Sequence, residues 1–172
     1  PRPPPPPARD PAAPQCCRCS SGTRGRRKGR LRAHGGGPVK PAQAMAHGFD
    51  VGADGTSFWI TDIGWMMGPW LIFGSLALGA TMVLYEGTPD HPQPDRLWRM
   101  VADHKVTVLG VSPTLVRGLM TQGDELPARH DLSSLRILGG TGQPWHPEPL
   151  NCAFEQLGAG RLPSLNYSGG TA

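Results

Sequence analysis

The chain has 172 residues, of which 24 are glycine and 20 are proline; the glycines follow no period of three and no heptad persists, which excludes collagen and a coiled coil. Eight of the prolines fall within the first 14 residues, so enough chain remains after them for one domain. The net charge of +4 suggests a nucleic-acid partner, but residues 1–40 carry +9 and residues 41–172 carry −5.

The N-terminal tail, residues 1–19, is predicted to be disordered because it consists almost entirely of Pro, Arg, Ala and Cys. Reading GC-rich codons in the wrong frame gives such a composition. Since the chain begins with Pro1 and its first methionine is Met45, we expect a fragment or a mis-started reading frame. The alternative is a proline-rich arm that adopts polyproline II and docks to an aromatic groove.

The four cysteines do not form a disulfide framework, because three of them lie within four residues and the fourth is far away. They are Cys16, Cys17, Cys19 and Cys152. No second ligand pair with zinc-site spacing accompanies them, so no metal bound by protein side chains is expected. Reduced thiols are typical of a cytoplasmic protein, and no secretory signal opens the chain.

The positive charge is concentrated in the run RGRRKGRLR at residues 24–32. A basic run with glycines can bind RNA electrostatically, but this one lacks the aromatic side chains that stack on bases. We therefore expect no nucleic-acid partner. A basic RNA-binding or interaction protein remains the alternative function.

Residues 63–85 contain no charged side chain and are numerous enough to span a bilayer. Glycines and a proline interrupt the segment, and its second part is the β-branched run TMVLY. This change predicts a buried helix, a turn and a buried strand, with no membrane contact. A membrane protein that spans the bilayer through 63–85 is kept as a further alternative.

Helices and strands alternate along the rest of the chain. Helices are predicted at 39–49, 69–78, 95–104, 113–120 and 147–157, and strands at 57–60, 81–85, 106–111, 135–138 and 164–167. Strands separated by single helices form right-handed parallel crossovers, so the fold class is a layered α/β sheet, mostly parallel and flanked by helices. Ligands bind such sheets beyond the carboxyl ends of the strands.

Four polar segments follow one another in a specific order: SSGTRGRRKG at 20–29, TDIGW at 61–65, LRILGGTGQPWHPE at 135–148 and NYSGGT at 166–171. Together they resemble the adenylate-forming superfamily, and within it the AMP-forming acyl-CoA synthetases of the acetyl-CoA synthetase type. The resemblance covers roughly residues 20–171. It implies that residues 20–172 are an incomplete part of the AMP-binding, large N-terminal domain of such an enzyme.

The resemblance also implies a two-step ligation. A small carboxylate attacks the α-phosphorus of ATP in the presence of Mg²⁺ and releases pyrophosphate, and the thiol of CoA then attacks the acyl-adenylate. The family's small C-terminal domain is missing in cis, so this piece alone is expected to be inactive.

The family's motifs assign nucleotide-binding residues by resemblance. Those of the phosphate loop are Ser20, Ser21, Gly22, Thr23, Gly25 and Lys28. Those of the adenine pocket are Gly142, Gln143 and Pro144, with Tyr167 beside the adenine and Thr171 facing the α-phosphate. Lys28 and Thr171 are the expected catalytic residues.

The acyl pocket is assigned in the same way to Trp65, Met66, Met67 and Thr141. Gly169 stands where acetate-specific relatives close the pocket with a tryptophan. Loss of an indole opens a large apolar volume, and methionine is an adaptable lining. We therefore expect a preference for acyl groups larger than acetyl.

Some positions depart from the family pattern. Arg24 and Arg27 replace a hydroxyl residue and a proline of the phosphate loop, and Gln143 replaces a glutamate. Ala172 stands where the family has the glutamate that holds Mg²⁺. These departures put the geometry of the phosphate loop and the metal site in question.

Overall fold

The computed structural model describes residues 4–5, 7–19, 26, 29–123, 125–157 and 160–167. Its centre is a five-stranded sheet with the strand order β4-β3-β5-β6-β7, in which all neighbours are parallel. The strands are β3 (Thr56–Trp59), β4 (Thr81–Val83), β5 (Val108–Val111), β6 (Ile137–Gly140) and β7 (Ser164–Asn166). The predicted layered, parallel α/β sheet is confirmed.

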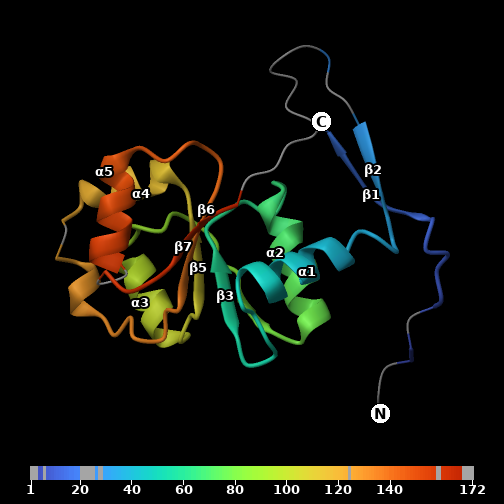
Figure 1. Ribbon diagram of the computed structural model, residues 1–172, viewed down its shortest axis with the longest axis horizontal. Coiled ribbons are helices and arrows are strands. Elements are labelled where there is room, and N and C mark those ends of the chain that lie inside the picture. Colours follow the sequence, from blue (N-terminus) through green and yellow to red (C-terminus); the bar gives the residue numbers. More distant parts are fainter. Residues whose placement is uncertain are drawn as a thin grey trace.

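Helices cover both faces of this sheet, α1 and α2 on one side and α3, α4 and α5 on the other (Figure 1). The helices are α1 (Val39–Gly48), α2 (Met67–Leu78), α3 (Arg96–Asp103), α4 (Pro113–Met120) and α5 (Pro147–Cys152). A short 3₁₀ turn, η1 (Pro127–Arg129), lies in the polar connection after α4. The helix predicted over 147–157 is α5 followed by a π-helical turn, η2 (Ala153–Leu157).

The apolar segment 63–85 forms a helix, a turn and a strand, as its composition predicts. Helix α2 has 12 residues and ends at Gly79, whose φ of 68° is the left-handed conformation that terminates helices. Strand β4 follows directly. Among the residues that the structure describes, no helix has both the length and the apolar character that a membrane span requires.

An antiparallel hairpin precedes the sheet, formed by β1 (Pro14–Cys19) and β2 (Gly29–Ala33). Of the tail predicted to be disordered over residues 1–19, residues 14–19 form strand β1. Composition alone favoured disorder, whereas the strand exists because its backbone pairs with a segment about 15 residues further on, from Cys19 opposite Gly29 to Pro14 opposite Ala33. Such non-local pairing leaves no signature in a single proline-rich stretch.

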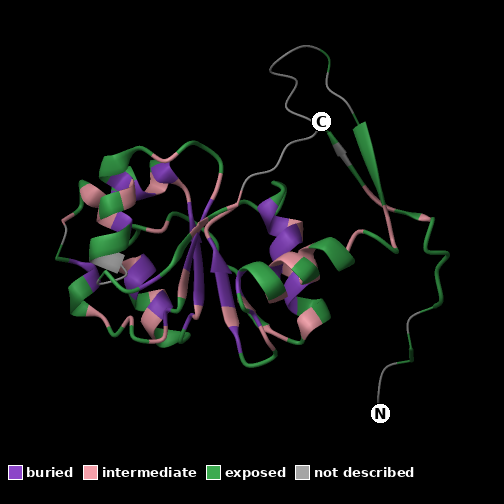
Figure 2. Cartoon of the chain, viewed as in Figure 1, coloured by how far each residue is buried: buried purple, intermediate pink, exposed green. Residues whose placement is uncertain are grey.

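Two hydrophobic cores lie on the two faces of the sheet, and Figure 2 shows the buried residues on both sides of it. Successive strand residues alternate between them, because side chains along a strand point to opposite faces. Phe58 packs with α3 and α4 in one core, and Trp59 packs with α1 and α2 in the other.

Trp59 lies flat against glycines of the neighbouring strands. A Cβ atom on Gly110 would come within 2.5 Å of ring carbons of Trp59, and one on Gly139 would lie 2.6 Å from its Cη2. Phe49 and Trp70 also pack against the indole, with ring centroids 5.5 Å and 5.1 Å away. The two glycines are thus required by close packing rather than by a turn.

Candidate functional site

The carboxyl ends of all five parallel strands meet at one edge of the sheet. The order of the strands reverses there, since β4 follows β3 on one side while β5, β6 and β7 extend on the other. In open α/β sheets a crevice at such a switch point is where ligands bind. The segments after β3, β5, β6 and β7 line this edge.

A cavity of about 510 Å³ occupies the edge, a size typical of small-molecule sites. It is lined by Trp59, Ile60, Thr61, Trp65, Met66, Met67, Val111, Ser112, Thr141, Gly142, Gln143, Pro144, Asn166 and Tyr167. The structure therefore brings together three of the predicted segments, at 61–67, 141–144 and 166–167.

Residues 61–67 form one wall of the cavity. The turn is fixed by Asp62, whose carboxylate accepts a hydrogen bond of 2.6 Å from the N–H of Gly64 and whose backbone carbonyl accepts one of 3.0 Å from the N–H of Trp65. The side chain of Met67 is buried, while Trp65 is 72% exposed and Met66 is 37% exposed. The two methionines predicted for the acyl pocket both line the cavity.

The connection after β6 forms a second wall. Gly142 has a φ of 100°, a conformation that favours glycine, so the chain turns sharply there. Gln143 is held by helix α4, because its Oε1 accepts hydrogen bonds from Thr114 Oγ1 at 3.0 Å and from Arg117 at 3.3 Å. Two donors, one of them the positively charged guanidinium of Arg117, thus fix the amide of Gln143 at the rim.

Tyr167 closes the cavity on the side of helices α1 and α2. Its N–H donates a hydrogen bond of 2.7 Å to the carbonyl of Gly140. Its ring lies 5.4 Å from that of Trp70 and 6.0 Å from that of Phe49. The tyrosine ring is therefore positioned by an aromatic cluster and faces the cavity from a fixed place.

Other predicted residues fall outside the residues that the structure describes. These are the phosphate-loop residues Ser20, Ser21, Gly22, Thr23, Gly25 and Lys28, and the third-loop residues Gly169 and Thr171. Their assignments stay predictions. The structure does place β1 and β2, the strands on either side of residues 20–28.

Trp59, Val111 and Ser112 line the cavity although the sequence reasoning did not single them out. Each lies at the carboxyl end of a strand, so the general rule for parallel sheets could have indicated them. Ser112 also caps α4, since its Oγ accepts a hydrogen bond of 3.2 Å from the N–H of Leu115.

The described lining of the cavity contains hydroxyl, amide and aromatic groups but no carboxylate. Within the described ranges no cluster of three His, Cys, Asp or Glu side chains could hold a metal ion. The lining therefore suits a neutral or anionic organic ligand, and none of these side chains is assigned to Mg²⁺. Amide and hydroxyl groups can hydrogen-bond to a base or a ribose.

A second hollow of about 750 Å³ lies beyond β3 and β4 and is lined in part by Tyr85. Burial raises the pKa of the Tyr85 hydroxyl, an effect that the positive charge of Arg96 partly opposes. The Arg96 guanidinium lies 5.4 Å from the centre of the tyrosine ring and donates to the backbone carbonyls of Glu86 and Thr88 at 2.9 Å each. Arg96 thus organises the loop that follows β4.

Comparison with known proteins gives a consistent result. Residues 1–166 match the family model described as AMP-binding enzyme. The chain is 44% identical over 144 residues to an acetyl-coenzyme A synthetase of Methanothrix soehngenii, covering 83% of this chain and 21% of that protein. It is 42% identical over 149 residues to that of Streptomyces coelicolor, covering 86% and 23%.

The same relationship holds for a solved structure. The chain superposes on an acetoacetyl-CoA synthetase from Streptomyces lividans with a TM-score of 0.82 and 31% sequence identity, over 93% of this chain and 25% of that one. The chain spans about a fifth to a quarter of the length of the relatives it matches.

Proposed function

Because the chain belongs to the AMP-binding enzyme family, we propose that its cavity binds the acyl and adenosine portions of an acyl-adenylate, as part of an ATP-dependent acyl-CoA ligase. The main support for this proposal is that residues 61–67, 141–144 and 166–167 line one cavity at the switch point of the sheet. The similarity to the two acetyl-coenzyme A synthetases supports the same activity.

The polar and apolar groups of the cavity divide between two parts of such a ligand. Met66 and Met67 offer an apolar lining for the acyl chain. Gln143 and Tyr167 offer an amide and an aromatic ring for the adenosine end. ATP supplies the activated phosphorus in this chemistry, and the described residues bind and orient the carboxylate and exclude water from it.

The phosphate-loop residues 20–28, with Lys28, and Thr171 are proposed to neutralise and orient the phosphates. ATP and CoA are the proposed co-substrates, and Mg²⁺ is the proposed metal cofactor. Ligation is proposed to need parts of the family's fold outside these 172 residues, so the chain alone is expected to release no pyrophosphate from ATP with a fatty acid and Mg²⁺. A cytoplasmic location is proposed, in keeping with Cys16, Cys17 and Cys19 being free thiols.

The acyl group is proposed to be larger than acetyl, because two methionines line the cavity and Gly169 stands where acetate-specific relatives have a tryptophan. The test is calorimetric titration of this chain with alkyl esters of AMP, which resemble acyl-adenylates but do not react. Each added CH₂ that becomes buried contributes about 0.8 kcal/mol, so butyl-AMP should bind about fifteenfold more tightly than ethyl-AMP.

Met66→Trp provides the matched variant, since an indole there would fill part of the cavity. It should remove most of the preference for butyl-AMP. Leu76→Trp, at an exposed position of α2, should leave that preference unchanged. Equal affinities for ethyl-AMP and butyl-AMP would contradict the proposed acyl pocket, and absence of any binding would contradict the nucleotide assignment.

A further inference from the structure

A third, smaller pocket of about 110 Å³ lies between the β1–β2 hairpin and helices α1 and α2. It adjoins the larger cavity, because Met66 and Tyr167 line both. Its polar lining includes Arg32 from β2 and Lys40 from α1, and Trp70 of α2 forms part of its wall. We call this the hairpin pocket.

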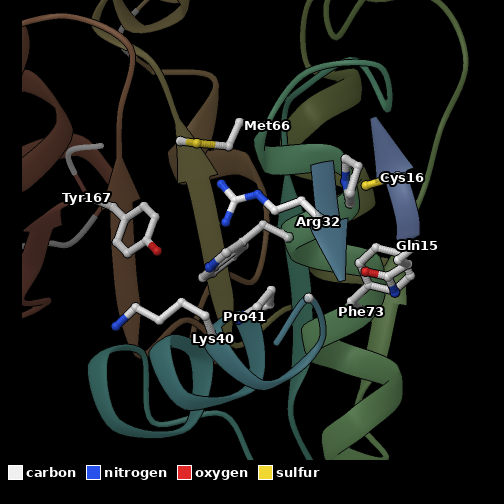
Figure 3. A pocket seen from close by; sticks show the side chains of 11 residues that line it. Gln15, Cys16, Arg32, Lys40, Pro41, Met66, Phe73 and Tyr167 are labelled. Atoms are coloured by element: carbon white, nitrogen blue, oxygen red, sulfur yellow. The ribbon is translucent and has the colours of Figure 1, made fainter. Parts of the chain in front are cut away.

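The side chains on the Tyr167 side of the hairpin pocket are hydrogen-bond donors. Figure 3 shows the Arg32 guanidinium and the Lys40 side chain extending toward Tyr167, whose hydroxyl points into the pocket. Gln15 and Cys16 lie on the opposite side of the pocket, near Phe73.

Trp70 adds a further donor with an unusual environment. Its side chain is only 6% exposed, and its indole Nε1 has no hydrogen-bond partner. A buried donor without an acceptor destabilises the folded state. An acceptor in the hairpin pocket would remove that destabilisation.

The charges around the pocket are not balanced. Lys40 Nζ donates a hydrogen bond of 3.1 Å to Gln43 Oε1, a neutral group. Within the described part of the chain, neither Arg32 nor Lys40 takes part in an ion pair, and no carboxylate lines the pocket. The lining of this small space therefore includes two exposed cations, Arg32 and Lys40. It also includes two buried polar atoms without a hydrogen-bond partner, the indole Nε1 of Trp70 and the Oε1 of Gln15.

We propose that the hairpin pocket binds an oxyanion, a carboxylate or a phosphate group, held by Arg32, Lys40 and the indole N–H of Trp70. A volume of about 110 Å³ has room for roughly four water molecules, which matches a group of four or five heavy atoms. Arginine and lysine both bind such groups through charge-assisted hydrogen bonds.

Two ligands present this chemistry. One is the distal carboxylate of a dicarboxylate whose other end occupies the larger cavity, since Met66 and Tyr167 separate the two spaces. The other is a phosphate group. The inference rests on the hairpin pocket's own residues, so it stands or fails independently of alkyl-AMP binding.

The test follows the indole N–H signals of the whole chain, labelled with ¹⁵N-tryptophan, by NMR. Trp70→Phe identifies the Trp70 signal among those of the five tryptophans. Glutarate and inorganic phosphate are titrated separately at constant ionic strength, with chloride as the reference salt. Millimolar concentrations of either oxyanion should shift the Trp70 signal while the signal of Trp98, in the other core, stays in place.

Arg32→Gln should weaken the binding about tenfold, the loss expected for one charge-assisted hydrogen bond. Arg99→Gln, an exposed arginine of α3 on the other face of the sheet, should leave the affinity unchanged. If Trp70→Phe does not fold, calorimetric titration of the two arginine variants gives the same comparison.

Tighter binding of glutarate than of phosphate assigns the pocket to a dicarboxylate, and the reverse order assigns it to a phosphate group. No shift of the Trp70 signal with either oxyanion overturns the proposal. Equal weakening by Arg32→Gln and Arg99→Gln also overturns it, because the effect would then reflect only net charge.

Discussion

Gly110→Ala tests the close packing of Trp59 on the sheet. The added Cβ would lie within 2.5 Å of ring carbons of Trp59, about 1 Å short of ordinary contact at 3.4–4 Å. The indole is 4% exposed and cannot move away, because Phe49 and Trp70 pack against it. Overpacking of this kind costs about 1–3 kcal/mol, and we expect the upper end of that range.

The measurement is urea denaturation followed by circular dichroism, with Gly118→Ala as the matched control. Gly118 lies in helix α4, and a Cβ there would meet nothing within 4 Å. The control should therefore gain about 0.5–1 kcal/mol in the free energy of unfolding, because alanine favours a helix more than glycine does. The two substitutions should shift stability in opposite directions.

A double-mutant cycle with Trp59→Leu identifies the indole as the cause. If the clash is with the ring, the loss of unfolding free energy caused by Gly110→Ala should be smaller by at least about 1 kcal/mol in the Trp59→Leu background. The reasoning fails if Gly110→Ala changes the free energy of unfolding by less than about 0.5 kcal/mol, or costs the same in both backgrounds.

Three further outcomes are expected. Ser112→Ala should lose about 1 kcal/mol of unfolding free energy in urea melts, since the Ser112 hydroxyl accepts a hydrogen bond of 3.2 Å in the first turn of α4; an unchanged midpoint would exclude this cap. Burial raises the pKa of the Tyr85 hydroxyl, so in an alkaline titration followed by absorbance the signal that Tyr85→Phe lacks should have its midpoint above the ordinary tyrosine pKa of about 10. Arg96→Gln should raise the pKa of Tyr85 further, because it removes a positive charge. The Ser133 hydroxyl donates to Asp131 and, with other contacts, lowers the pKa of that carboxyl well below its usual range. The free energy of unfolding of the unsubstituted chain should therefore exceed that of Asp131→Asn by a constant amount above about pH 4, and this difference should shrink as the pH falls further. A difference that grows in acid would contradict the prediction.

The order of helices and strands could be predicted from the sequence because each crossover carries its own local signals. Pro113 at the start of α4 and the apolar run of β5 are examples. The parallel sheet then follows from the alternation alone. The position of the larger cavity follows in turn, because three of the quoted loops begin where strands end.

The glycines at 139 and 140 show what local signals miss. The sequence suggested that β6 ends at Leu138 and that the glycines open a loop, but the strand continues through Gly140. Gly139 lies against Trp59, and Gly140 lies against Trp145, so both are small because aromatic rings from elsewhere in the chain approach them. Tertiary packing of this kind is not visible in a local pattern.

The hairpin pocket could not be predicted for the same reason. Arg32 belongs to a run that reads as a solvated basic segment, and Trp70 belongs to an apolar helix. Only the pairing of β1 with β2 and the packing of α2 place them around one space. Pairing across the chain, rather than composition, decides this part of the site.

The hydrophobic cores pack on the faces of the sheet, while the cavity is lined largely by loops at the carboxyl ends of the strands. This separation has an evolutionary consequence. Most of the core lies on the two faces of the sheet, whereas rim residues such as Met66, Gln143 and Pro144 are exposed. Exchange of rim residues changes what the cavity accepts while most of the packing stays intact. Lineages with this architecture can therefore diverge in specificity at little thermodynamic cost, except at positions such as Trp59, Met67 and Val111, where one buried side chain belongs to a core and also lines the cavity.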